Sequence, residues 1–477
     1  MFDQTIIPDV HYQRSQLLFW AIVGTGARRY KRDPTIFDRI TKRFTEKPLS
    51  LECIMHNPTA AVQALVVLCM WPSPVTSVFK DASPAWAGMA TSLAIQTGLH
   101  AICKEEEFAR KPATRRPLVG TPAARFVHSD GSPATSSARA KIAFRTSLWT
   151  NCLIACQSTM ICDGLLPITV PANENLERQQ LITYMLGDQV NLRYRLYVVQ
   201  TDAVAAIRRT IDLESVSCGA ELVSLINIFD KQLNTITIDC TDTIGLISRD
   251  CARLMILCFH FFVQIEHIDR HGFLQIFTIA QQVILQISEL DTAHGFVEYL
   301  PIYYARMVCL AAYCILRISK SGLREELKLE DPGGVFFKAI EISKRRSVQH
   351  GDLDALNSIM LTKLWSSNEI FVQPDGTRNS LHLDLRGRLA MSVAFDCFWW
   401  WRKEFGYLFN DSIPASEETT REYGDIYTEE KSLAISAGTS NQTMAGEPNL
   451  GQYALDLTDF SGWDWNIGLT PLESMSF

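Results

Sequence analysis

The sequence predicts an all-α protein built from many helices, and three observations carry that prediction. Apolar residues recur at helical spacing along most of the chain, alternating strand patterns are nearly absent, and helix start and stop signals flank the periodic segments. Of the 477 residues, 47% are hydrophobic and 20% are charged, as in a soluble globular protein. The length suggests roughly two to four packing units.

Two neighbouring helices are expected in the first hundred residues. Residues 60–71 are apolar on all sides, which is typical of a helix in the middle of a core. The second helix is expected to start at Ser83-Pro84, where serine can cap and proline suits the first turn, and to end at Gly98. Its apolar face is expected to comprise Trp86, Met89, Ala90, Leu93 and Ala94.

The same periodicity predicts the remaining helices. They are expected at 13–30, 138–161, 181–208, 221–233, 250–267, 274–290, 302–319, 335–346, 352–364 and 385–405. The longest apolar runs, 60–71 and 252–265, are shorter than the ~18 residues that a membrane span needs, so no membrane partner is expected. No basic-then-apolar segment opens the chain, which argues against secretion.

Two stretches break the helical pattern. Residues 108–137 contain four prolines and several arginines, and are expected to form an exposed or disordered loop. Residues 410–452 are rich in Ser, Thr, Glu and Gly and are expected to be disordered. The prediction is therefore a helical domain over 1–409 followed by a disordered acidic tail over 410–477.

The charge is distributed unevenly between these two parts. The net charge is -7, and residues 410–477, with 12 acidic and 2 basic side chains, carry -10 of it, which leaves +3 on the first 409 residues. Binding to duplex DNA relies on lysine and arginine replacing the counterions around phosphates. The chain by itself is therefore not expected to bind DNA sequence-specifically.

The cysteines and histidines do not form a metal-binding pattern. The 13 cysteines are an odd number scattered through apolar stretches, which predicts reduced core residues in a cytosolic or nuclear protein. The tightest group, Cys152, Cys156 and Cys162, has no second half. His267 and His271 lie four apart before Gly272, and are expected at the polar C-terminal end of a helix. No metal or other cofactor is expected in this chain.

Catalytic motifs are also missing from the sequence. It contains no glycine-rich phosphate loop, no hydrolase elbow and no kinase motif set, so no enzymatic activity is expected. Asp352 and Asp384 lie where helices should start, and are expected to stabilise helix dipoles. The basic clusters at 344–346 and 110–116 fit either a nuclear import signal or solvated surface.

A set of short motifs occurs in a fixed order within residues 34–171. In order, they are the helix end Trp71-Pro72, the segment from Trp86 and Gly88 to Gly98-Leu99-His100, the pattern Arg145-x-x-x-Trp149, and Gly164 followed by Pro167. This order resembles the middle regulatory region of fungal zinc-cluster transcription factors. The family usually has Gly-Arg-Pro at the last position, where Leu165-Leu166 intervene here.

The same residues also have a structural interpretation. Pro72 is expected to end one helix and Gly98 to cap another. Trp71, Trp86 and Trp149 are expected to be large side chains of the core. We therefore expect the motif residues to serve packing even within the family.

The resemblance implies a function that composition and periodicity do not. It implies a transcription regulator of the RNA polymerase II type, located in the nucleus, with a helical regulatory domain that could homodimerise. The family reads DNA with an N-terminal six-cysteine cluster, Cys-x2-Cys-x6-Cys and a similar second half, that binds zinc. No such pattern occurs here, so the protein is expected to bind DNA only through a module that is missing from this chain. The cluster could be naturally absent or lie upstream of the given sequence.

The C-terminal tail carries a motif of its own. Large apolar side chains alternate with acids at Asp456, Asp459, Phe460, Trp463, Asp464 and Trp465. Such a segment can dock its aromatic rings into a coactivator or another part of the transcription machinery while its acids keep it solvated. The alternative is a tail that folds back on the helical body. Two other functions stay open for the whole chain, a helical enzyme or metabolite-binding protein, and a helical scaffold.

Overall fold

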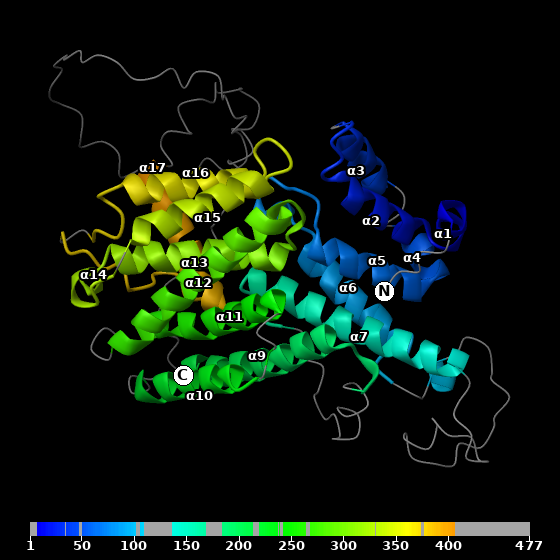
Figure 1. Cartoon of the computed structure of the whole chain (residues 1–477), viewed down its shortest axis with the longest axis horizontal. Coiled ribbons are helices and arrows are strands. Elements are labelled where there is room, and N and C mark those ends of the chain that lie inside the picture. Colours follow the sequence, from blue (N-terminus) through cyan, green and yellow to red (C-terminus); the bar gives the residue numbers. More distant parts are fainter. Residues whose placement is uncertain are drawn as a thin grey trace, which may run out of the picture. The chain divides into compact units, whose positions relative to one another are not determined.

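The computed structural model describes residues 7–33, 35–46, 50–101, 105–108, 136–167, 184–212, 219–236, 238, 242–263, 268–329, 331–373 and 376–405. These residues form α-helices and short 3-10 helices, and the only strand-like pairing among them is one isolated β-bridge between Val372 and Arg378 (Figure 1). The prediction of an all-α fold is confirmed. The chain divides into two compact units, Met1–Trp401 and Arg402–Phe477.

The helices follow one another along nearly the whole described part of the chain. The α-helices are α1 (Pro8–Arg14), α2 (Gln16–Ala27), α3 (Ile36–Glu46), α4 (Leu51–His56), α5 (Pro58–Met70), α6 (Ser83–Gln96), α7 (Ser136–Cys162), α9 (Asp188–Asp212), α10 (Gly219–Asn234), α11 (Thr243–Leu257), α12 (Arg270–His294), α13 (Ile302–Ser319), α14 (Leu323–Glu326), α15 (Pro332–Arg346), α16 (Leu353–Ser366) and α17 (Ser392–Phe405). The 3-10 helices are η1 (Val78–Lys80), η2 (Glu105–Phe108), η4 (Cys258–Phe262), η6 (Phe296–Tyr299) and η7 (Leu389–Met391).

The first core of the unit forms around α5. Asn57 caps this helix by accepting a hydrogen bond from the Ala60 amide (3.2 Å), and Pro58 occupies its first turn. All residues from Ala60 to Cys69 are buried, as the sequence predicted for a helix that is apolar on all sides. The helix packs against α2, α6 and α7.

The buried face of α6 matches the predicted one in part. Ala90, Leu93 and Ala94 are buried as predicted, whereas Met89 is 37% exposed and Trp86 is only partly buried. The prediction was wrong for these two large side chains because short side chains let α6 pack closely on both α5 and α7, and the two larger ones then lie at the margin. The predicted start at Ser83-Pro84 is confirmed, but Ser83 is the first residue of α6 and not its cap, and its amide donates to Asp81 (2.9 Å).

A second core forms around α13, which the sequence predicted with its observed bounds. Every residue from Met307 to Ser319 is buried, and α13 packs against α11, α12, α15 and α16 and also contacts α5 and α7 (Figure 1). Among the described residues, α12 and α13 are long and apolar enough to cross a membrane by length and composition. For α13, burial within the helical body accounts for that apolar character.

Two predicted helices begin or end elsewhere because side chains take over the backbone hydrogen bonds. The helix predicted at 385–405 starts only at Ser392, whose hydroxyl accepts from the Arg388 amide (3.0 Å). The carboxylate of Asp396 accepts from the amides of Asp384 (2.8 Å) and Leu385 (2.9 Å), so Asp384 lies outside any helix start. The helix predicted at 250–267 starts earlier, at Thr243, and gives way to η4 after Leu257.

The predicted loop and tail lie mostly outside the described residues. At the ends of the 108–137 segment, Phe108 belongs to η2 and Ser136 starts α7, while 109–135 are not described. Residues 406–477, with the whole aromatic and acidic motif, also lie outside the described part.

Candidate functional site

The Gly98-Leu99-His100 motif forms the C-terminal end of α6. Gly98 adopts a φ of +68°, and the amides of Gly98 and Leu99 donate to Ile95 O and Ala94 O, both at 2.9 Å. These two hydrogen bonds and the left-handed glycine define a Schellman motif, in which the second residue beyond the cap packs inward. Leu99 does so, with 0% of its surface exposed.

The Arg145-x-x-x-Trp149 motif on α7 reaches this same helix end. The Arg145 guanidinium donates to Gly98 O (2.8 Å) and Thr97 O (3.3 Å), so a cation lies at the negative end of the α6 dipole. Trp149, only 1% exposed, places its ring 6.1 Å from that of His100. Two motifs separated by more than forty residues therefore form one contact between α6 and α7.

The glycines of this segment should respond oppositely to alanine. Gly98→Ala is expected to lower the free energy of unfolding by about 1–2 kcal/mol, because an L side chain is disfavoured at positive φ and the new Cβ would lie 2.5 Å from the Phe108 ring. Gly88→Ala is the matched control: it lies inside α6 with no atom within 4 Å of a new Cβ, so a gain of about 0.5–1 kcal/mol is expected. Chemical denaturation measures both, and equal losses would contradict this interpretation.

Gly164 ends α7 with the same Schellman motif that Gly98 forms at the end of α6. Its φ is +66°, and the amides of Gly164 and Leu165 donate to Ile161 O (2.9 Å) and Met160 O (2.8 Å). A Cβ at Gly164 would lie 2.3 Å from the carbonyl oxygen of Arg388, so the backbone of a distant segment passes directly over it. Leu165 takes the position beyond the cap, and Pro167 is buried shortly after.

Asp163, between α7 and Gly164, is a buried carboxyl group with an altered pKa. Burial, the largest effect, and the nearby Asp81 raise the pKa of Asp163 to about 6, against the opposing effects of Arg306 and Arg388. Its position at a helix C-terminus, where the dipole is negative, adds to the penalty on the ionised form. The neutral acid is therefore favoured more in the folded protein than in the unfolded chain.

Asp163→Asn is expected to stabilise the protein at pH 7 by about 1–2 kcal/mol, since the amide needs no proton to stay neutral. The folded pKa lies above the usual 3.8, so the wild-type carboxyl favours folding most below pH 3.8. That contribution is lost as the pH rises through about 6. Urea denaturation of both proteins at several pH values tests this. Stability curves that stay parallel between pH 4 and pH 7 would be the contrary result.

The Trp71-Pro72 turn joins the N-terminal helices to the second core. Trp71 caps α5, and Arg28 at the end of α2 donates to the carbonyl oxygens of Trp71 and Pro72. The Trp71 indole donates through Nε1 to Tyr299 O (3.0 Å), 228 residues along the chain. The ring is only partly buried: Trp71 and Trp86 pack against the core from its margin, whereas Trp149 is buried as predicted for a large side chain of the core.

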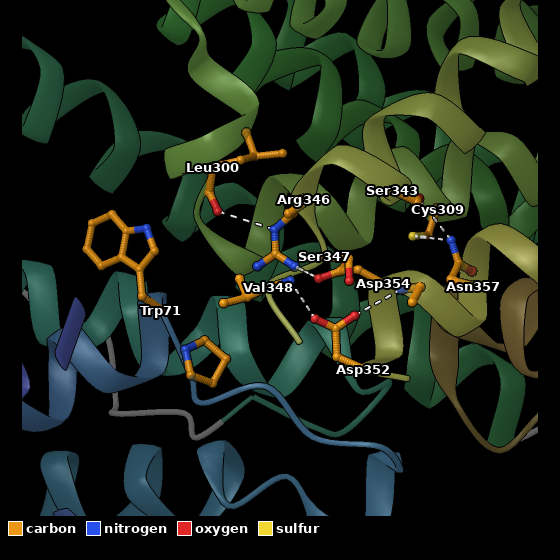
Figure 2. Close-up of polar contacts among 12 residues, drawn as sticks. Trp71, Leu300, Cys309, Ser343, Arg346, Ser347, Val348, Asp352, Asp354 and Asn357 are labelled. Carbon is orange, nitrogen blue, oxygen red and sulfur yellow. Dashed lines mark hydrogen bonds and ion pairs between the residues drawn. The ribbon is translucent and has the colours of Figure 1, made fainter. Parts of the chain in front are cut away.

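We call this contact between Arg28, the Trp71-Pro72 turn and Tyr299 the joint, and a second arginine extends it to α15. Arg29 donates through Nη2 to Arg345 O and Arg346 O, both at 2.7 Å, at the C-terminal end of that helix. Arg346 is 4% exposed, pairs with Asp354 and reaches Leu300 O (3.4 Å), as Figure 2 shows beside Trp71. The basic cluster 344–346 is therefore only partly a solvated helix end, because Arg346 is buried in this joint.

Asp352 fixes the turn between α15 and α16. Its carboxylate accepts from the amides of Val348 (2.7 Å), Gln349 (3.1 Å) and Ala355 (3.0 Å), so it caps α16 as the sequence predicted (Figure 2). The next amide, that of Leu353, donates to Val75 O (3.0 Å) in the segment after the Trp71-Pro72 turn. The joint thus consists mainly of backbone carbonyls held by the partly exposed Arg28 and Arg29 and the buried Arg346.

The electrostatics of the joint reflect its burial. Burial, and secondarily the positive charge of Arg346, lower the pKa of Arg28 to about 10, while Asp354 opposes the shift. Arg28 therefore stays charged at neutral pH and keeps its hydrogen bonds to the turn. These residues hold the helices together.

The metal-binding expectations can be compared with the structure in part. Cys152 and Cys156 are buried thiols with sulfurs 3.9 Å apart, which confirms the prediction of reduced core cysteines there. Gly272 lies inside α12, which Asp269 caps, so His271 is in the first turn of that helix. The prediction that it lies at the C-terminal end of a helix is wrong, and His267 lies outside the described residues. Within the described ranges no three His, Cys, Asp or Glu side chains gather as a metal would require.

Comparisons with known proteins place this chain beside fungal regulators. SEF1 of Eremothecium gossypii is 24% identical over 410 residues, which is 80% of this chain and 35% of that protein. SEF1 of Kluyveromyces lactis is 37% identical over 102 residues, 21% of this chain and 9% of that protein. "Transcriptional regulatory protein SEF1" of Candida albicans is 36% identical over 92 residues, 19% of this chain and 10% of that protein.

These relatives are all longer than the given chain, which spans about a third of their length or less. No family model matches the chain, and no solved structure is similar to it. The chain is therefore similar to fungal proteins that are named as transcription factors or regulators, over most of its sequence for the Eremothecium gossypii protein and over about a fifth of it for the other two.

Proposed function

We propose that this chain regulates transcription by RNA polymerase II, and that its helical body is the regulatory region. The single observation that carries the proposal is the meeting of the family-type motifs: Arg145 caps the helix that ends in Gly98-Leu99-His100, against the buried Trp149 ring. Similarity to named transcriptional regulators supports it. The protein would act in the nucleus.

In this proposal a separate zinc cluster reads the DNA. The first 409 residues carry a net charge of only +3, too little to neutralise the phosphates of a specific site. A selection from random DNA with the purified chain should enrich no single motif, and elemental analysis should find no stoichiometric zinc. One enriched motif, or one zinc per chain, would contradict this part of the proposal.

The tail would recruit a coactivator. Phe460, Trp463 and Trp465 stand among Asp456, Asp459 and Asp464, after the stretch 410–452 that has few apolar groups. The acids would keep the aromatic rings solvated until a partner groove buries them. Each buried ring can contribute about 1.5–3 kcal/mol, which suits a weak and reversible contact once ordering costs are subtracted.

A fusion experiment tests the proposal. Residues 453–477, joined to an unrelated DNA-binding domain, should activate a reporter gene, and alanine at Phe460, Trp463 and Trp465 should reduce activation to background. The matched control replaces Thr458 and Ser461 by alanine and should keep full activity. A silent fusion, or a triple-alanine tail as active as the original, would instead favour a tail that packs on the helical body. Deleting the tail should then lower the thermal stability of the full chain.

A further inference from the structure

Two buried cysteines from different elements of the second core are in contact. Cys258 is the first residue of η4, directly after α11, and Cys314 lies within α13. Their sulfur atoms are 3.5 Å apart, although 56 residues separate them in the sequence. Both side chains are completely buried, and both thiols are free. The fold therefore brings two reactive groups together that the sequence places far apart.

A second contact between thiols, on α7, is of a different kind. Cys152 and Cys156 lie four residues apart on this helix, with their sulfurs 3.9 Å apart. Side chains at this spacing have Cβ atoms about 5–6 Å apart, whereas a disulfide needs about 3.5–4.5 Å. A bridge there would distort α7, so this pair is a packing contact only.

Cys258 lies where the backbone can adjust. Its amide donates to Leu254 O and Ile256 O at the end of α11, and the 3-10 helix η4 begins at this residue. Hydrogen bonds of a 3-10 helix have poorer geometry than those of an α-helix. The two sulfurs need to approach by about 1.5 Å to reach the length of an S–S bond. A shift of η4 supplies that movement while α13 stays intact.

A buried guanidinium lies beside the pair. Arg317 follows Cys314 by one turn of α13, and its Nη1 donates to the sulfur of Cys397 (3.5 Å). Burial, the largest effect, and the hydrogen bond with Cys258 raise the pKa of Cys314, whereas the charge of Arg317 opposes the rise. The proton therefore stays on Cys314, and Cys258 is the acceptor of that hydrogen bond. A nearby cation favours the nucleophilic thiolate, so Arg317 assists the reaction of this pair.

We propose that Cys258 and Cys314 form a reversible disulfide when the protein meets a small uncharged peroxide such as hydrogen peroxide. The Cys258 thiolate attacks one peroxide oxygen, the O–O bond breaks, and the released hydroxide takes up a proton to become water. The sulfur of Cys314 then attacks the resulting sulfenic acid, the S–O bond breaks, and the oxygen leaves as a second water. Two electrons pass from the thiols to the peroxide, and a dithiol reverses the reaction by exchange.

The bond would close a loop that contains all of α12 and η6. A cross-link over a loop of this size restricts the unfolded chain far more than the folded one. The melting temperature should therefore rise by roughly 4–8 °C on oxidation. The bond would also attach η4 to α13 beside the ion pair of Arg317 and Asp396. The site is a property of the helical body and does not depend on the function proposed above.

Peptide mapping of the full chain tests the proposal. The protein is treated with hydrogen peroxide, its remaining thiols are alkylated, and mass spectrometry identifies the cross-linked tryptic peptides. The main cross-link should join Cys258 to Cys314, and fragmentation should distinguish Cys314 from Cys309 of the same peptide. A dithiol should remove it. Absence of this cross-link overturns the proposal, and so does a main cross-link through Cys53, which alone among the described cysteines is not buried.

Variants link the cross-link to the gain in stability. Cys258→Ala and Cys314→Ala should each abolish both the cross-link and the rise in melting temperature on peroxide treatment. Cys152→Ala is the matched control, because it removes a buried thiol from the packing contact on α7, and it should keep both. Melting curves before treatment verify that each variant is folded. A rise in Cys258→Ala as large as in the original protein would contradict the proposal.

Discussion

Replacing Asp396 by alanine is expected to lower the free energy of unfolding by about 3–5 kcal/mol, because it leaves a buried guanidinium without its counter-charge. Arg317 and Asp396 both have side chains that are 0% exposed, and Arg317 Nη1 lies 2.7 Å from Asp396 Oδ2. The same carboxylate also accepts from the amides of Asp384 and Leu385. The substitution therefore removes an ion pair and the support of the segment before α17, and urea denaturation measures the loss.

A double variant separates the ion pair from simple packing. Arg317→Met combined with Asp396→Leu buries no charge, so it should be less destabilised than Asp396→Ala alone. The Arg317 guanidinium also lies 4.5 Å from the centre of the Phe371 ring, which a methionine can still contact. If the double variant is no more stable than the single one, the cost lies in packing and the electrostatic explanation fails.

Trp149→Ala is expected to destabilise the protein by a similar amount, about 3–5 kcal/mol. It removes the largest fully buried side chain among the described residues and leaves a cavity in the core. The ring lies beside His100 and one helical turn from Arg145, so the vacated space borders the capped end of α6. Loss of the ring should therefore also loosen that helix end. Hydrogen exchange at the amides of Gly98 and Leu99 should become faster, in addition to a lower melting temperature.

Trp86→Ala provides the control for this prediction. Trp86 belongs to the same set of motifs but is only partly buried at the margin of the core, so its removal leaves a smaller cavity and should cost clearly less. If both alanine variants lose the same stability, burial does not distinguish the two tryptophans in solution.

The sequence predicted the helices well where one segment alone determines the pattern. The bounds of α13 follow from apolar periodicity and the flanking proline, and Gly98 marks the end of α6 through a requirement for positive φ that is purely local. The choice of buried face on α6 is different. It depends on how closely α5 and α7 approach α6. The spacing of apolar residues in the sequence favours the largest ones as core positions and gives no information on that distance.

The joint could not be predicted from the sequence for a related reason, because its residues come from distant segments. Arg346 reads as the end of a basic run, and only the fold brings Asp354, Leu300 and the Arg29 guanidinium to it. Similarly, His271 and Gly272 suggested a helix end, whereas the Asp269 side chain starts a helix there.

The joint between the Trp71-Pro72 turn and α15 rests on main-chain oxygens as acceptors for Arg28 and Arg29. A carbonyl oxygen is present whatever side chain the residue carries, and it bears no net charge. Dissolved salt should therefore weaken these contacts less than it weakens exposed ion pairs. A substitution at an accepting position leaves the acceptor in place, whereas each arginine has no substitute with the same reach and fork geometry. For these hydrogen bonds, mutational tolerance should accordingly be one-sided: higher at an acceptor such as Pro72, whose side chain makes none of the polar contacts of the joint, and low at Arg28 and Arg29, which directly follow α2.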